Sequence, residues 1–172
     1  MRQFLSVAVV LSCACVTSQP VPEASSEYVP SGEVMVRAKA ASFDKVRVRS
    51  TRMNLTKRTD GSWSGTFDKE PFDLSVDETS VHGYEFNLSK SDSTEGHTII
   101  TGVWQTKQVR IELDGEKAML KLGTNVQNFP VRDATKEGVI GYGGAGGLTL
   151  KGEAASTTAV WPQFALALLS TM

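Results

Sequence analysis

Short runs in which apolar and polar residues alternate dominate the sequence from residue 33 onward. The clearest case is a pair of runs, 109–113 and 118–122, on either side of Asp114-Gly115. A period of two places successive side chains on opposite faces of a β-strand, and Asp-Gly suits the turn of a hairpin. The pattern therefore predicts antiparallel strands joined by short turns.

Other runs extend this prediction along the chain. Asp60-Gly61 lies between the runs 53–57 and 63–67, as in a second hairpin. The apolar residues change parity between Val48 and Met53, so a strand must bulge or break there. No helical period lies between the runs. We therefore expect an all-β fold, one antiparallel meander that forms a small barrel or a two-sheet sandwich of about eight to ten strands.

The C-terminal residues have a different period. Pro162 suits a first helical turn, and apolar residues follow at helical spacing. These residues favour a short helix packed on the sheet. Because Phe164, Leu166 and Leu168 also alternate, a last strand is the alternative. The residues at helical spacing are Trp161, Phe164, Ala165, Leu168 and Leu169.

The first fifteen residues have the composition of an export signal. Arg2 supplies a positive charge, residues 4–11 are mainly apolar, and small residues lie around Cys13 and Cys15. The apolar run is much shorter than the roughly 20 residues that a membrane-spanning helix needs. We expect a signal peptide over 1–15 and export of the rest of the chain.

Each cysteine follows a small residue, Ser12 before Cys13 and Ala14 before Cys15. This arrangement resembles the processing site of bacterial lipoproteins, in which the cysteine is acylated and becomes the mature N-terminus. Val10 supplies the aliphatic residue usual three places before the cysteine for Cys13 only. The resemblance implies a lipid anchor at Cys13 or Cys15 in the outer membrane, facing the periplasm or the surface. Ordinary cleavage and secretion is the alternative.

The rest of the chain divides into a tether and one domain. Residues 16–32 are rich in Ser, Thr, Pro and Glu and have no apolar period, which predicts a flexible tether. Residues 33–172 form the expected single β domain. No cysteine follows Cys15, so this domain is expected to depend on core packing without disulfides.

The charge composition bears on the choice of partner. The chain has 18 Lys and Arg against 19 Asp and Glu, which lacks the basic excess of a nucleic-acid-binding protein. A local basic cluster predicts a solvated strand face, with an anionic partner as the alternative. Its members are Arg47, Arg49, Arg52, Lys57 and Arg58.

Catalytic and metal-ligating residue types are not clustered in the sequence. The histidines are His82 and His97, and neither has a cysteine near it in the chain. We therefore expect no metal and no cofactor. The leading hypothesis is a non-catalytic envelope lipoprotein that binds another envelope protein or supports an assembly. A hydrolase is a weaker hypothesis.

A small apolar ligand is the alternative partner. The segment Gly61-Ser62-Trp63 resembles the Gly-x-Trp of lipocalin-like and avidin-like barrels, over three residues that do not by themselves identify a family. Such a carrier or sensor would need a cavity inside the barrel. Its lining would include residues expected to point inward: His82, Tyr84, Phe86, Trp104 and Leu120.

Overall fold

The computed structural model describes residues 28–92, 97–114, 117–133, 139–143, 147–155 and 160–172. Within these residues the chain forms fourteen strands, a 3-10 turn and one helix. The elements are β1 (Gly32–Val36), β2 (Lys39–Phe43), β3 (Arg47–Ser50), β4 (Met53–Lys57), β5 (Trp63–Phe67), β6 (Glu70–Val76), β7 (Ser80–Gly83), β8 (Phe86–Asp92), β9 (Thr98–Trp104), β10 (Lys107–Leu113), β11 (Lys117–Leu122), β12 (Asn125–Asp133), β13 (Val139–Tyr142), β14 (Leu148–Gly152), η1 (Glu153–Ala155) and α1 (Trp161–Thr171).

The strands form the expected antiparallel meander, and the meander closes into a barrel. Each strand pairs with the next one in the chain, and β14 pairs with β1 over five residues, from Gly32↔Gly152 to Val36↔Leu148. The all-β prediction is confirmed. The sequence left open a barrel or a two-sheet sandwich, and the strand pairing shows that the fold is a barrel.

Both predicted hairpins are present. In β10 and β11, Ile111 lies opposite Leu120, and both side chains are buried. In β4 and β5, Leu55 lies opposite Gly65. The connection between β4 and β5 spans residues 58–62, and Asp60 accepts a hydrogen bond from the backbone N–H of Ser62. The turn is therefore longer than the tight turn that Asp-Gly suggested.

The number of strands exceeds the expected eight to ten because short turns divide the chain more often than the alternation indicates. The parity change between Val48 and Met53 is a hairpin between β3 and β4, closed over Thr51 and Arg52. The chain turns in the same way between β1 and β2, where Arg37 has a φ of 57°. Each of these stretches is thus two paired strands joined by a tight turn.

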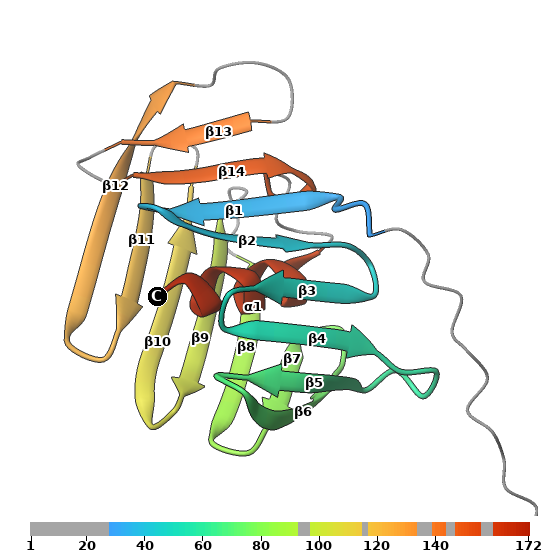
Figure 1. Ribbon diagram of the computed structural model, residues 1–172. Helices are drawn as coiled ribbons and strands as arrows, with labels where there is room; N and C mark the ends of the chain where they lie inside the picture. Colours follow the sequence, from blue (N-terminus) through green and yellow to red (C-terminus); the bar gives the residue numbers. More distant parts are fainter. Residues whose placement is uncertain (1–27, 93–96, 115–116, 134–138, 144–146, 156–159) are drawn as a thin grey trace, which may run out of the picture.

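The C-terminal helix is present but lies inside the barrel, so its predicted position on the sheet is wrong. Figure 1 shows α1 between the strands β1–β4 in front and β8–β11 behind it. The helix is apolar on all sides, and the barrel wall surrounds it. Its side chains from Phe164 to Thr171 are all buried.

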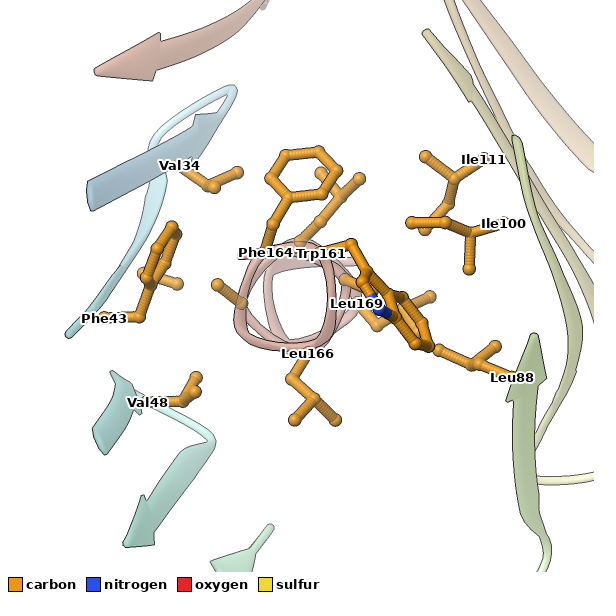
Figure 2. Packing of buried hydrophobic residues seen from close by; sticks show 14 of the residues in the cluster. Val34, Phe43, Val48, Leu88, Ile100, Ile111, Trp161, Phe164, Leu166 and Leu169 are labelled. Carbon is orange, nitrogen blue, oxygen red and sulfur yellow. The ribbon is translucent and has the colours of Figure 1, made fainter. Parts of the chain in front are cut away.

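Side chains from both halves of the wall pack against the helix (Figure 2). Val34, Phe43 and Val48 lie on one side of it, and Ile100 and Ile111 lie on the other. All five are buried members of one hydrophobic core. Burial of each large aliphatic or aromatic side chain contributes roughly 1.5–3 kcal/mol, so α1 is a major part of the core.

Hydrogen bonds hold both ends of α1. Where the helix begins, Trp161 Nε1 donates a hydrogen bond of 2.9 Å to the carbonyl oxygen of Glu78, which lies in the β6–β7 turn. Where it ends, Lys39 Nζ donates to the Met172 carbonyl oxygen at 3.4 Å. The helix therefore runs through the interior from the end with the β6–β7 turn to the end with the β1–β2 turn.

Candidate functional site

The predicted lipidation sites lie outside the described residues. Cys13, Cys15 and the expected signal peptide precede residue 28, as does most of the expected tether. Among the residues that the structure describes, no helix has the length and apolar character to cross a membrane.

Three of the five predicted ligand-binding residues point into the barrel. Phe86, Trp104 and Leu120 are buried. The rings of Phe86 and Trp104 meet edge to face, with centroids 4.7 Å apart and an interplanar angle of 82°. Phe67 and Phe72 also contact Trp104, so these aromatic rings fill one end of the interior by packing on one another.

His82 and Tyr84 point outward, and the prediction that they face the interior is wrong. The alternation does not continue from His82 to Phe86, because a turn separates β7, which ends at Gly83, from β8, which begins at Phe86. Tyr84 lies at the tip of this hairpin and is 87% exposed. His82 is exposed on the outer face, with Nε2 2.5 Å from Ser80 Oγ and 3.9 Å from Asp77 Oδ2.

The five residues therefore do not form one ligand-binding site. The expected cavity would occupy the centre of the barrel, and in the structure that space contains α1. Phe164, Leu166 and Leu168 of the helix are fully buried there. Phe86, Trp104 and Leu120 are core residues of the same cluster.

A pocket of about 390 Å³ lies instead on the outside of the barrel. Two rows of outward-facing residues line it, running across β14, β1, β2 and β3. We call this hollow the outer-wall pocket. The first row is Lys151, Glu33, Ser42 and Arg49, and the second includes Thr149, Met35 and Ala40, with successive members paired across the sheet.

The hollow follows from the sizes of the side chains in these rows. Strand β2 contributes only Ala40 and Ser42 to the outer face. Its neighbours carry longer side chains, Glu33 and Met35 on β1 and Arg49 on β3. Because the short side chains lie between longer ones, the surface forms a trough along β2.

Tyr28 forms one wall of the pocket. Its hydroxyl group donates a hydrogen bond to Ser42 Oγ at 2.9 Å. Its ring lies under two guanidinium groups, with Arg49 Cζ 4.7 Å and Arg47 Cζ 5.6 Å from the ring centroid. Burial raises the pKa of the Tyr28 hydroxyl, against the lowering effect of its hydrogen bond to Ser42. The segment that leads into β1 is thus attached to the barrel wall at Tyr28.

Two of the three cationic side chains around the pocket form ion pairs with carboxylates. Lys151 Nζ pairs with Glu33 Oε2 at 3.3 Å, and Arg47 Nε pairs with Asp44 Oδ2 at 3.8 Å. Within the described part of the chain, no carboxylate lies within ion-pair distance of Arg49. Arg49 therefore gives the pocket a net positive charge on its β3 side.

The basic cluster noted in the sequence is divided by the fold. Arg52 makes a double hydrogen bond to Asp68, at 2.8 and 2.5 Å, and Arg58 pairs with Asp73 at 3.4 Å. Only Arg47 and Arg49 of the cluster contact Tyr28. The cluster was the one signal in the sequence that pointed toward this surface. The sequence could not separate the arginines of the cluster, because the residues that they contact, such as Asp68, Asp73 and Tyr28, belong to other parts of the chain.

A second pocket, of about 320 Å³, lies where α1 enters the barrel. Trp161, Pro162 and Gln163 of the first helical turn line it, with Lys57 and Asp77 from the wall. Trp161 donates a hydrogen bond to the Glu78 carbonyl oxygen there, so we interpret this hollow as a result of the way the helix end packs against the wall. Among the described residues, no three of the acidic, histidine or cysteine side chains gather as a metal site.

No protein-family model, curated protein or solved structure matches the chain.

Proposed function

We propose that this chain is a non-catalytic lipoprotein of the cell envelope, anchored through Cys13 or Cys15, that binds its partner on the outside of the barrel at the outer-wall pocket. The observation that supports this site is the position of α1. The helix fills the interior with buried side chains such as Phe164 and Leu166, so we place the ligand in the outer-wall pocket and not inside the barrel.

The position of Tyr28 also supports this proposal. Tyr28 belongs to the C-terminal part of the proposed tether, residues 16–32, and forms part of the pocket through its contacts with Ser42 and Arg49. A partner bound in the pocket would therefore lie where the tether meets the barrel. That arrangement suits a module that holds a ligand at a fixed place near its anchor.

The lipocalin-like carrier remains a weaker proposal. A ligand in the interior would have to displace α1, and with it the buried contacts of Trp161, Phe164 and Leu169. Loss of a few such side chains from a core costs several kcal/mol. A small apolar ligand would have to recover that free energy through contacts of its own.

Native mass spectrometry of the protein, purified in mild detergent from its own envelope, tests the proposal. The comparison uses the wild-type chain, Ala40→Trp, which fills the trough, and Gln108→Trp, which adds the same ring to an exposed position of β10. We expect a non-covalent companion mass in the wild type and in Gln108→Trp, and its loss in Ala40→Trp. Equal thermal melting temperatures of the two variants establish that both are folded.

A companion that persists in Ala40→Trp contradicts the outer-wall site. If that companion is instead lost from Phe164→Ala, which opens space beside α1, the ligand lies in the interior and the carrier proposal replaces ours.

A further inference from the structure

We infer that the ligand of the outer-wall pocket is a small anionic amphiphile, with a carboxylate or phosphate group that binds Arg49 and an apolar body that lies in the trough along β2. The inference rests on the proposed function for the location of the site. It adds the chemical class of the ligand.

The anionic group is inferred from the way in which Arg49 is held. Its guanidinium group stacks over the Tyr28 ring, with Cζ 4.7 Å from the centroid. Stacking uses the face of the guanidinium plane and leaves the N–H donors at its edge available. These donors are arranged to bind two oxygens of one carboxylate or phosphate at once.

The other two cationic side chains near the pocket are paired with carboxylates, so Arg49 is the one that we expect to bind the anion. At the other side of the trough, Lys151 is neutralised by Glu33. Next to Arg49 on β3, Arg47 already pairs with Asp44. In the described residues, Arg49 has only the tyrosine ring as a partner, and that ring carries no charge while its hydroxyl stays protonated. An anion at Arg49 would therefore gain a charge-assisted hydrogen bond without displacing a carboxylate.

The apolar body is inferred from the floor and far wall of the pocket. Ala40 and the backbone around Ala41 form the floor, and the Met35 side chain, 39% exposed, forms the wall on β1. A volume of about 390 Å³ lies near the lower end of the range for small-molecule sites, roughly 300–1,000 Å³. The pocket thus suits a single short chain or ring better than a folded partner's surface.

Tyr28 has a positioning role in this proposal. Its hydrogen bond to Ser42 fixes the ring, and the ring fixes the plane of the Arg49 guanidinium. Tyr28→Phe retains the ring and loses the hydrogen bond, whereas Tyr28→Ala loses both. We therefore expect Tyr28→Ala to weaken anion binding more than Tyr28→Phe does.

Isothermal titration of the full chain with three probes tests the inference. The probes are octyl phosphate and octanoate, which are anionic, and octyl glucoside, which is neutral, all below their micellar concentrations. The variants are Arg49→Gln and, as the matched control, Arg110→Gln on β10, where Arg110 pairs with Glu112 at 2.9 Å. We expect at least tenfold tighter binding of the anionic probes than of octyl glucoside, a loss of that preference in Arg49→Gln, and no change in Arg110→Gln.

The Arg49 Nε–H signal in an NMR spectrum gives a second readout, because it shifts only if the anion binds at that group. A signal that does not move on addition of octyl phosphate overturns the inference, as does an equal affinity for all three probes. If equal affinities are all lost in Ala40→Trp, the pocket binds ligand but does not select charge, and the proposed function stands. If no probe depends on Ala40 or Arg49, the proposed site fails as well.

Discussion

Phe67 and Trp104 meet edge to face inside the barrel, with ring centroids 4.9 Å apart and an interplanar angle of 88°. They occupy corresponding places in two similar hairpins. Each lies two residues after a glycine, Gly65 or Gly102, and each is followed by a two-residue turn of non-glycine residues with positive φ. The barrel therefore contains one local arrangement twice, and its two copies pack against each other.

The strand register of the two copies is the same. In the first, Leu55 of the segment Asn54-Leu55-Thr56-Lys57 lies opposite Gly65. In the second, Leu88 of Asn87-Leu88-Ser89-Lys90 lies opposite Gly102. A side chain at either glycine would meet the backbone carbonyl oxygen of the facing asparagine, Asn54 or Asn87. Glycine is therefore required at both positions for the strands to approach each other.

Gly65→Ala and Gly102→Ala are expected to destabilise the fold by roughly 2–3 kcal/mol each, because the new methyl group forces the facing strand backbone to move. Gly61→Ala is the control. Gly61 has a φ of 88° and nothing within 4 Å of its position for a Cβ, so that change adds only backbone strain, about 1 kcal/mol. Urea unfolding measures the free energy of unfolding of all three variants, and an equal loss of stability in each would contradict the steric explanation.

Phe164→Ala is expected to lower the free energy of unfolding by roughly 3–5 kcal/mol, because it leaves a cavity between α1 and the wall. Gln163→Ala, at the neighbouring half-buried position, removes one long hydrogen bond of 3.4 Å to the Lys45 carbonyl and is expected to cost about 1 kcal/mol. Chemical denaturation compares the two. Similar losses would show that α1 lies outside the core.

The pKa of Asp68 is expected to rise toward its ordinary value in Arg52→Gln. In the wild type, the hydrogen bonds from Arg52 hold the pKa of this carboxyl below that value. A lowered pKa in the folded state stabilises the protein above the unfolded-state pKa of about 3.9, and this contribution is lost as the pH falls through the folded pKa. The effect on stability is small because Asp68 is exposed.

NMR titration of the Asp68 carboxyl carbon measures this pKa. Arg58→Gln, which removes the partner of Asp73 in a neighbouring part of the wall, serves as the control and should leave the pKa of Asp68 unchanged. An Asp68 pKa that is the same in all three proteins would contradict the ion pair with Arg52.

Intact-mass measurement of the protein from its own membranes is expected to find acyl chains on the N-terminal cysteine of the mature chain. Cys13→Ser removes the modification if Cys13 is the site, and Cys15→Ser removes it if Cys15 is the site. Detergent phase partition follows the same variants, since the unmodified protein moves to the aqueous phase. A wild-type chain with free thiols, or cleaved beyond Cys15, would contradict the lipid anchor.

The sequence was sufficient for the features that depend on neighbouring residues. Alternation and Asp-Gly predicted the hairpin of β10 and β11, and the spacing around Phe164 predicted α1. Both signals act over a few residues, within one strand pair or one helical turn. The basic cluster around Arg49 was visible in the same way, although its members could not be distinguished.

Barrel closure decided the number of strands and the direction of the side chains near the turns. Glu85, Gln105 and Thr106 have φ values of 55°, 46° and 65°, which cost a non-glycine residue roughly 1–2 kcal/mol each in the left-handed region. No residue preference marks such turns, because strand pairing on both sides imposes them. For this reason the alternation from His82 through Tyr84 to Phe86 predicts the wrong face for His82.

The position of α1 and the outer-wall pocket likewise depended on the tertiary structure. An apolar helix can pack on a sheet or inside a barrel, and only the space enclosed by the closed wall selects the interior. The pocket brings Tyr28, Arg49 and Lys151 together from segments far apart in the chain. Such a site arises from strand register and relative side-chain size, which no single stretch of sequence contains.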